Sequence, residues 1–377
     1  MPDQLYKAGS IVGKLPLLSV IITNHNYANY ILQAIDSIKS QTYENLECVV
    51  IDDASSDDSF QLVSDHFQKL KDDRFRVIRL ARNVGQMAAM KAGLENTTGV
   101  FVHFLDADDI VFPDFAEWHI RAHLNSSYSA GVTASDTAQI DADGQVLEST
   151  FHMLLKHRTT SPESPVKPIG SAALPRFENN LVQLEAPLSS LFYIERFFEG
   201  WHVVQSSAFV FRRDVLNVII PKDNESMRIC ADYYWMTFVH WISGTLTIGA
   251  TLSGFRLHRK NKFSNQAVLG GRYAPGFFRP EIRRAIDEEI AKFIIENIDQ
   301  LVPMLGLEYP LTYIRKIYNA GSLYRAVKHS KTIRNHLSRG SDRLFRIKYG
   351  TRAHVYNHYP KLFKIAHKLR KLIRKAA

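Results

Sequence analysis

A cluster of carboxylates follows an apolar run in the first third of the chain. Six mostly apolar residues, 100–105, lead directly into Asp106, Asp108 and Asp109. Such a run is typical of a buried strand in a parallel sheet, and ligands of these sheets bind beyond the carboxyl ends of the strands. Three neighbouring carboxylates repel one another, so a hard divalent cation is the simplest partner for them. The alternative is a solvated acidic helix cap before Pro113.

Polar side chains suited to a nucleotide follow the other apolar runs. They are Thr23, His25, Asn26, Asp53 and Asn83. A buried carboxylate such as Asp53 can accept a hydrogen bond from a base N–H, and the His25 ring can stack on a base. Asp106 can bind ribose hydroxyls, while Asp108 or Asp109 can hold a metal that bridges two phosphates. The sequence has no G-x-G-x-x-G and no Walker motif, which argues against a Rossmann dinucleotide site or a P-loop.

Alternating strands and helices must position these side chains. Apolar runs predict strands at 17–23, 46–51, 75–80 and 100–105, and helical spacing of apolar residues predicts helices at 30–38, 59–70 and 86–95. Strands that alternate with helices of about ten residues form βαβ units, which build a parallel sheet with right-handed crossovers. The polar strand ends are therefore expected to share one rim.

The second half of the chain has a less regular pattern. We expect strands at 130–135, 206–211 and 246–255, two short strands around an Asp-Gly turn at 140–146, and an aromatic helix at 232–241. Residues 156–190 hold several prolines and show no periodicity, which predicts a long loop. Beyond Pro280 the spacing of apolar residues is helical throughout.

Seven segments, in this order and at this spacing, resemble glycosyltransferase family 2. They are 19–26 (SVIITNHN), 50–57 (VIDDASSD), 83–85 (NVG), 104–109 (FLDADD), 207–213 (SAFVFRR), 231–233 (ADY) and 256–264 (RLHRKNKFS). The resemblance covers about residues 17–265. It implies the GT-A fold: a Rossmann-like, mostly parallel sheet flanked by helices, here followed by a basic α-helical extension.

The resemblance implies nucleotide-binding roles for the first segments. Thr23, His25 and Asp53 would bind the base, usually uracil or thymine, and Asp53 would face the ring N–H. Asn26 and Asn83 belong to the same predicted nucleotide-binding loops. Family members commonly have Tyr at the position of His25. An imidazole still stacks, but it makes base affinity sensitive to pH.

The resemblance also implies a site for the diphosphate and for Mg²⁺ or Mn²⁺. Asp106 and Asp108 match the D-x-D pair, for ribose and metal respectively, and Asp109 is the alternative metal ligand. His258 matches a position near the diphosphate and is a further candidate ligand. Residues 90–91 are Met-Lys where many members have Arg-Asn, so a pyrophosphate contact falls to Lys91 or is absent.

Asp232 matches the catalytic base of the family. It would deprotonate the acceptor hydroxyl as that hydroxyl attacks C1 of the sugar, and this direct displacement inverts the sugar configuration. Ala231 precedes Asp232 where Glu or Gly is common, so the site has one carboxylate here rather than two.

Several residues near these motifs have structural explanations as well. Asp52 and Asp57 suit turn and helix-cap positions, and His103, in mid-strand, suits a packed core. Residues 212–213 (Arg-Arg) are either a solvated strand end or a contact for an acceptor phosphate. Residues 201–202 (Trp-His) either line an acceptor pocket or belong to the core.

Composition sets the class of protein and its partners. With 377 residues the chain can hold two structural units, and its two cysteines, Cys48 and Cys230, suggest a reducing compartment without a disulfide framework. We expect no signal peptide and no membrane-spanning segment, because neither pattern is visible. Residues 311–377 carry 18 Lys and Arg against one acid, a net +17, so the rest of the chain carries −8 of the total of +9.

This basic region ends in a predicted amphipathic helix at 359–375. Its apolar residues form one stripe and cations fill the other face, as in helices that lie on anionic membranes. The alternative is a helix packed on the catalytic body. No nucleic-acid-binding fold accompanies the charge, so we expect no nucleic acid partner.

These observations predict a domain plan and a function. Residues 1–15 are a lead-in, 16–275 a catalytic domain with a nucleotide-binding half (16–112) and an acceptor half (113–275), and 276–377 a basic helical region. The expected function is metal-dependent, inverting transfer of a sugar from a UDP- or dTDP-sugar to a saccharide or lipid-linked acceptor, as in cell-surface polysaccharide synthesis. The expected location is cytoplasmic, at the inner face of the membrane. The alternative is a catalytically silent relative that binds nucleotide or glycan.

Overall fold

The structure of the chain is a computed structural model. It describes residues 15–148, 166–168, 175–178, 181–184, 191–196, 206–222, 224–258, 261 and 280–317. The chain divides into two compact units, Met1–Pro280 and Glu281–Ala377. The first unit contains the sheet and every predicted site residue.

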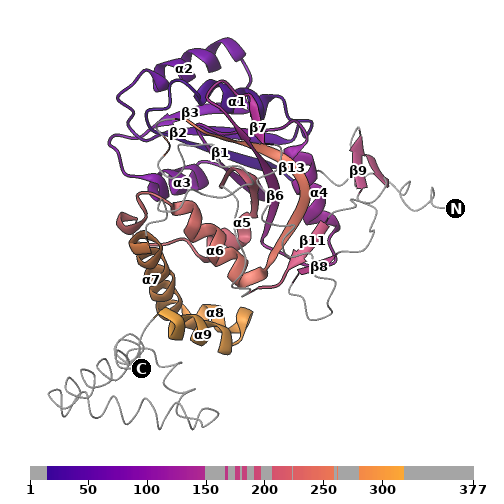
Figure 1. Cartoon of the computed structure of the whole chain (residues 1–377), viewed down its shortest axis with the longest axis vertical. Coiled ribbons are helices and arrows are strands. Elements are labelled where there is room, and N and C mark those ends of the chain that lie inside the picture. Colours follow the sequence, from indigo (N-terminus) through magenta and orange to yellow (C-terminus); the bar gives the residue numbers. More distant parts are fainter. Residues whose placement is uncertain are drawn as a thin grey trace, which may run out of the picture. The chain divides into compact units, whose positions relative to one another are not determined.

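The alternation predicted for the first hundred residues is confirmed. The elements are β1 (Leu18–Asn24), α1 (Ile31–Lys39), β2 (Leu46–Asp52), α2 (Ser59–Leu70), β3 (Phe75–Arg79), α3 (Gln86–Glu95) and β4 (Phe101–Asp106) (Figure 1). Each begins within one residue of its predicted start. Periodicity located these elements well because β1, β2 and β4 are buried almost throughout and the helices bury apolar residues against the sheet.

The sheet order brings the polar strand ends together. Within the sheet the order is β3-β2-β1-β4, and these strands are all parallel. The chain therefore builds outward from β1 on one side and crosses to its other side at β4. Thr23 lies opposite Asp106 and Asn24 lies opposite Asp52. A crevice where the strand order reverses is the usual ligand position in open α/β sheets.

The second half extends the same sheet past β4. The order continues β12 (Phe209–Arg212), β6 (Val132–Ile140), β13 (Thr245–Arg256), β11 (Leu191–Ile194) and β8 (Val166–Pro168), with β5 (Ile110–Val111) on β13 and β7 (Val146–Glu148) on β6. Strand β6 runs parallel to β13, whereas β12 is antiparallel to both of its neighbours. The mostly parallel sheet flanked by helices is confirmed.

Some expectations for this half need correction. The run predicted as a strand at 206–211 begins with a 3-10 turn, η2 (Ser206–Ala208), because the two serines hydrogen-bond across to the acidic cluster. Within the predicted loop at 156–190, the described residues form strands: β8, β9 (Pro175–Glu178) and β10 (Leu181–Leu184). Strand β8 pairs with β11, and β9 and β10 pair with each other. Strands of three or four residues are too short to show a clear alternation, so periodicity did not reveal them.

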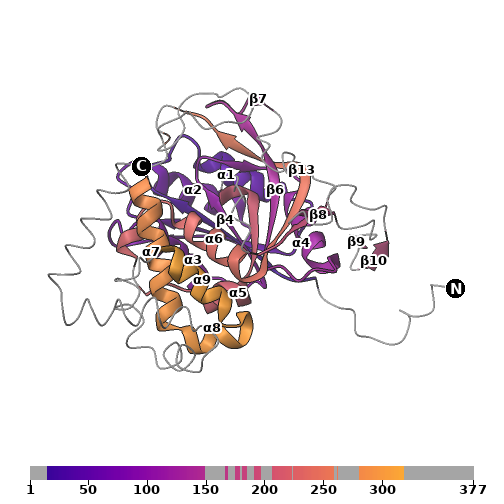
Figure 2. The ribbon, with the colours of Figure 1, turned by 60° about the horizontal axis from the view of Figure 1, so that its bottom comes forward.

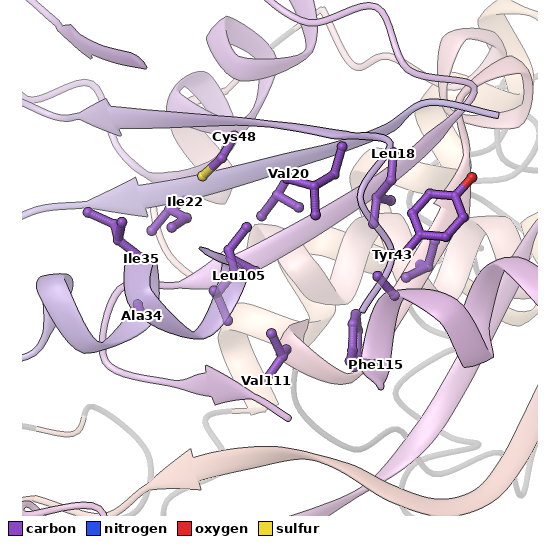
Figure 3. Close-up of a cluster of buried hydrophobic side chains, with 14 of the residues drawn as sticks. Leu18, Val20, Ile22, Ala34, Ile35, Tyr43, Cys48, Leu105, Val111 and Phe115 are labelled. Atoms are coloured by element: carbon purple, nitrogen blue, oxygen red, sulfur yellow. The ribbon is translucent and has the colours of Figure 1, made fainter. Parts of the chain in front are cut away.

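Helices cover both faces of the sheet. The apolar side chains of alternate β1 residues pack with α1, α2 and α4 (Phe115–Asn125) in one buried cluster (Figure 3). Helices α3, α5 (Arg213–Val218) and α6 (Ala231–Ser243) lie on the other face (Figures 1 and 2). Helix α3 sits directly on β1, since a Cβ on Gly93 would lie 2.2 Å from Ile21 Cγ2. Helices α4 and α5 were not predicted from the sequence.

His103 is a core residue, as its mid-strand position predicted. Its side chain is fully buried and its Nδ1 lies 2.8 Å from the carbonyl oxygen of Phe209. Burial lowers the pKa of His103 to about 4, so the ring is neutral at physiological pH. A neutral donor to a strand carbonyl is a structural role.

Arg213 is neither a solvated strand end nor a group at the rim. Its guanidinium donates to the carbonyl oxygens of Leu94 and Gly99 and to the hydroxyls of Ser19 and Thr97. These partners lie at the amino ends of β1 and β4, the edge of the sheet opposite the acidic cluster. Arg213 therefore ties α5 to the sheet, whereas Arg212 makes an exposed ion pair with Asp214.

The second unit is helical in its described part. It contains α7 (Pro280–Glu296), α8 (Ile298–Leu305) and α9 (Glu308–Ile317), as the helical spacing beyond Pro280 predicted. The Tyr313 hydroxyl donates to Asp287 and joins α9 to α7. None of the helices in the described segments is long and apolar enough to cross a bilayer. The predicted amphipathic helix at 359–375 lies outside the described residues, as does residue pair 201–202.

The two adjacent arginines provide a matched stability test. We expect Arg213→Ala to lower the free energy of unfolding by about 2–4 kcal/mol, because it leaves carbonyl and hydroxyl partners unsatisfied. Arg212→Ala is expected to cost less than about 1 kcal/mol, as for other exposed ion pairs. Urea unfolding of both variants measures the difference. Equal costs would contradict the structural role of Arg213.

Candidate active site

The carboxyl ends of β1 and β4 form the floor of the candidate site. Asp106 is the last residue of β4, and η2 lies beside it. The Ser206 hydroxyl donates to Asp106, and the backbone N–H of Asp106 donates to the Ser207 hydroxyl at 3.3 Å. Thr23 is partly buried directly across the strand pair. Two segments about 100 residues apart in sequence therefore meet at Asp106.

Asp109 is an internal residue of this region. Its side chain is 1% exposed, and its two oxygens accept from the Ser207 hydroxyl at 2.7 Å and the Arg256 backbone N–H at 2.9 Å. Burial, together with the charges of Asp108 and Asp106, raises the pKa of Asp109 well above its usual value. The sequence left Asp108 and Asp109 as alternative metal ligands. The geometry favours Asp108, since Asp109 is almost completely enclosed by the protein whereas Asp108 is 9% exposed.

Asp108 contacts His258, the residue of the last motif that is predicted to lie near the diphosphate. His258 Nε2 lies 3.0 Å from Asp108 Oδ2, and both side chains are mostly buried. The Tyr27 hydroxyl also donates to Asp108, and burial beside three aspartates raises the pKa of Tyr27. The Tyr30 ring packs on His258 with centroids 4.7 Å apart. The chain thus joins residues 150 positions apart into one polar pair.

This pair is the part of the site that suits a divalent cation. A carboxylate and an imidazole are both ligands that Mn²⁺ accepts, and Mg²⁺ takes the carboxylate readily. In the described part of the chain, no group of three or more His, Cys, Asp or Glu side chains could hold a metal ion. Asp108 and His258 would therefore supply two ligands, and the remaining positions would be left for diphosphate oxygens and water.

Asp53 holds the loop at 83–85, which precedes α3. Its carboxylate oxygens accept from the backbone N–H groups of Val84 at 2.7 Å and Gly85 at 2.8 Å. The exposed His25 ring points its Nδ1 at the Asp53 carbonyl oxygen at 2.9 Å, so Nδ1 carries the proton. Asn83 lies beside the same carbonyl at 3.5 Å. Thr23, His25, Asp53 and Asn83 therefore do gather at one end of the sheet.

Asn26 acts on the protein itself. Its Oδ1 accepts from the backbone N–H of Ser56 at 2.7 Å and that of Asp57 at 3.2 Å, and its φ is +66°. The expected turn roles of Asp52 and Asp57 agree with the structure. Asp52 accepts from Asn24 at 2.8 Å, and Asp57 accepts from Ala28 and Ser59 near the start of α2. These contacts hold the loops after β1 and β2 together.

Arg228, rather than Lys91, contacts the loop at 83–85. The Lys91 ammonium donates to the Pro221 carbonyl at 2.8 Å and to Asn224 at 3.2 Å, so it holds the segment before α6. The Arg228 guanidinium donates to the side chain and carbonyl of Asn83, and 42% of the Arg228 side chain is exposed. No motif in the sequence marked Arg228. Its position depends on how the segment before α6 docks on the loop.

Asp232 lies in the first turn of α6. Burial raises the pKa of Asp232 to about 6, and backbone N–H groups oppose this only in part. Cys230, two residues before Asp232, has a left-handed backbone conformation with φ +60°. Gln86 connects the two regions: it accepts from the Ala231 N–H at 2.9 Å and lies 3.5 Å from Asp106. A carboxylate with this pKa can act as a base near neutral pH.

Comparisons with known proteins agree with the motifs. A model of the family described as Glycosyl transferase family 2 matches residues 19–219, just over half of the chain. An uncharacterized glycosyltransferase of Nostoc sp. is 28% identical over 250 residues, 66% of this chain and 67% of that protein. Another from Haemophilus influenzae is 36% identical over 112 residues, 30% of this chain and 44% of its own length. The crystal structure of S. aureus TarS 1-349 in complex with UDP-GlcNAc superposes with a TM-score of 0.46 at 16% identity, covering 82% of this chain and 81% of that one.

The raised pKa of Asp232 predicts a pH-dependent cost to stability. Because the folded protein favours the protonated carboxyl, the charged form is destabilising above pH 6. Asp232→Asn should therefore stabilise the fold by about 1–3 kcal/mol at pH 8, and the gain should disappear as the pH falls toward 4. Urea unfolding across this pH range measures it. Asp143→Asn, at an exposed turn, is the control, and a pH-independent gain would contradict the prediction.

Proposed function

The chain belongs to glycosyl transferase family 2, and we propose that it transfers a sugar from a nucleotide diphosphate sugar to a hydroxyl acceptor. The observation that carries this proposal is the convergence of three predicted groups. Residues 84–86 hydrogen-bond to Asp53, to Asp106 at the end of β4 and to Ala231, the residue before Asp232 on α6. A donor in contact with Asp53 and Asp106 would present its sugar toward α6.

The donor that this site best suits is a UDP- or dTDP-sugar. The exposed His25 ring offers a face for stacking on the base, and Thr23 and Asp53 lie beside it at the same edge. Asp53 retains acceptor capacity for a base N–H, since a carboxylate has about four lone-pair positions and two are in use here. Asp106 would accept from the ribose hydroxyls.

Asp108 and His258 would hold a Mg²⁺ or Mn²⁺ ion beside the diphosphate. When bound, such an ion neutralises charge on the leaving diphosphate. Arg228 adds a second positive charge next to Asn83, on the nucleotide side. Asp106 and Asp108 are carboxylates of the same site, so these cations would offset the repulsion between them and a dianionic donor.

Asp232 would act as the general base. Its pKa of about 6 leaves the carboxylate ionised at pH 7 to 8, yet more basic than an exposed aspartate. The proton of the acceptor hydroxyl passes to Asp232 as the hydroxyl oxygen forms its bond to C1 of the sugar. The bond from C1 to the diphosphate oxygen breaks on the opposite side, so the configuration at C1 inverts.

The acceptor and the location of the protein are proposed from the sequence. A saccharide or lipid-linked glycan acceptor would agree with a basic region, 311–377, that carries a net +17. The amphipathic stretch at 359–375 would place the enzyme at an anionic membrane surface, on the cytoplasmic side. A catalytically silent relative is the second candidate, and turnover separates the two.

Donor binding can be measured by thermal unfolding with UDP, dTDP and GDP, each with and without Mn²⁺. We expect UDP or dTDP to raise the melting temperature, by the equivalent of about 2.7 kcal/mol at 100 times Kd. Asp108→Asn should remove the increment that depends on Mn²⁺ and leave the metal-free increment. Asp143→Asn is the matched control. No stabilisation by any nucleotide would contradict the proposal.

Turnover tests the base and excludes the silent relative. With a UDP- or dTDP-sugar we expect slow donor hydrolysis or transfer, with kcat/KM rising as the pH increases through about 6. Asp232→Asn should lower kcat by about 10²–10⁴-fold while nucleotide binding is retained. Nucleotide release in a coupled assay gives both values. Normal turnover in this variant would show that another group is the base.

A further inference from the structure

Gln86 makes three hydrogen bonds, two to the segment at the start of α6 and one to the end of β4. Its backbone N–H donates to the Arg228 carbonyl at 2.9 Å, and its side-chain oxygen accepts from the Ala231 N–H at 2.9 Å. Its side-chain N–H₂ group reaches Asp106 at 3.5 Å. One amide side chain therefore touches both the acidic end of β4 and the helix that carries Asp232.

The position of Gln86 is fixed by the loop before it. Gly85 has φ +89°, and a Cβ at this position would lie 2.7 Å from the Arg228 Cα. The backbone of the loop and the segment before α6 are thus in direct contact, which only glycine permits. The Asp53 carboxylate fixes the other side of the loop through the N–H groups of Val84 and Gly85. Gln86 is the next residue, so its side chain starts from a defined point.

The first N–H group of α6, that of Ala231, takes its acceptor from outside the helix. The first N–H groups of a helix have no partner within it, and a capping side chain usually supplies one. Here the N-cap residue is Cys230, in a left-handed conformation and without a side-chain cap hydrogen bond. The side-chain oxygen of Gln86 acts as the capping acceptor for the Ala231 N–H. Asp232 is the following residue, and its carboxylate accepts from its own N–H and from that of Tyr233. The contact with Ala231 therefore fixes the helical turn on which this carboxylate is held.

We propose that Gln86 is a positioning residue that caps α6 from α3 and so sets Asp232 relative to the donor. This inference rests on the proposed function, since it assigns Gln86 to the same sugar transfer. The side-chain oxygen of Gln86 orients the base, and the side-chain nitrogen ties that orientation to Asp106. A displacement of about 1 Å in a reacting group can cost 10²-fold in rate, so loss of the cap should be visible in kcat.

Two substitutions separate the two side-chain contacts. Gln86→Met preserves length but removes both, and we expect kcat to fall about 10–100-fold with the KM for the donor within about threefold. Gln86→Glu keeps an acceptor for the Ala231 N–H and places a charge next to Asp106. It should retain kcat within about fivefold while it raises the donor KM. Gln68→Met, on the exposed face of α2, is the control and should change neither constant.

Binding and stability measurements complete the test. UDP-induced stabilisation and the melting temperature are measured for each variant in the full chain. A merely structural role for Gln86 would lower the melting temperature and change both constants together in both variants. Wild-type kcat in Gln86→Met, or an equal loss of kcat in Gln86→Glu, would overturn the proposal. A wild-type chain that neither binds nucleotide nor turns over would instead refute the proposed function.

Discussion

The buried carboxylate of Asp109 is the contact on which the rest of the site depends. It joins β4 to η2 through Ser207 and to the end of β13 through the Arg256 backbone. The Arg256 guanidinium, also fully buried, donates to the carbonyl oxygens of Asp108, Asp141 and Ala142. A buried charge is costly unless its hydrogen bonds are satisfied. The network therefore holds three distant segments together and supports Asp106 and Asp108 next to it.

Several side chains of the site accept hydrogen bonds from main-chain N–H groups of neighbouring loops. Asp53 binds two of them to form the loop at 84–85, Asn26 binds two at the start of α2, and Gln86 binds one at the start of α6. These side chains give the irregular segments the hydrogen bonds that helices and strands have internally. The consequence is that loops at the rim are held by side chains of neighbouring loops.

The position of a polar residue in a motif does not show whether its side chain is buried and bound by the protein or available to a ligand or solvent. Asp106, Asp108 and Asp109 are consecutive members of one acidic cluster, yet Asp109 is internal and Asp108 pairs with His258. Arg212 and Arg213 are neighbours, yet one is exposed and the other has four partners. Lys91 lies on the predicted helix but points to the segment before α6. Burial and partners, which are non-local, decide each case.

The sequence by itself determined the alternating elements of the first hundred residues and the set of side chains at their ends. This was possible because strands covered on both faces and helices with one apolar face leave a periodic pattern. The order of motifs also identified the family. Only the tertiary structure decided that β12 enters the sheet antiparallel, that Arg228 lies beside Asn83, and that Gln86 caps α6. Each of these depends on pairing or docking between segments about 100 or more residues apart, and such contacts leave no local pattern in the chain.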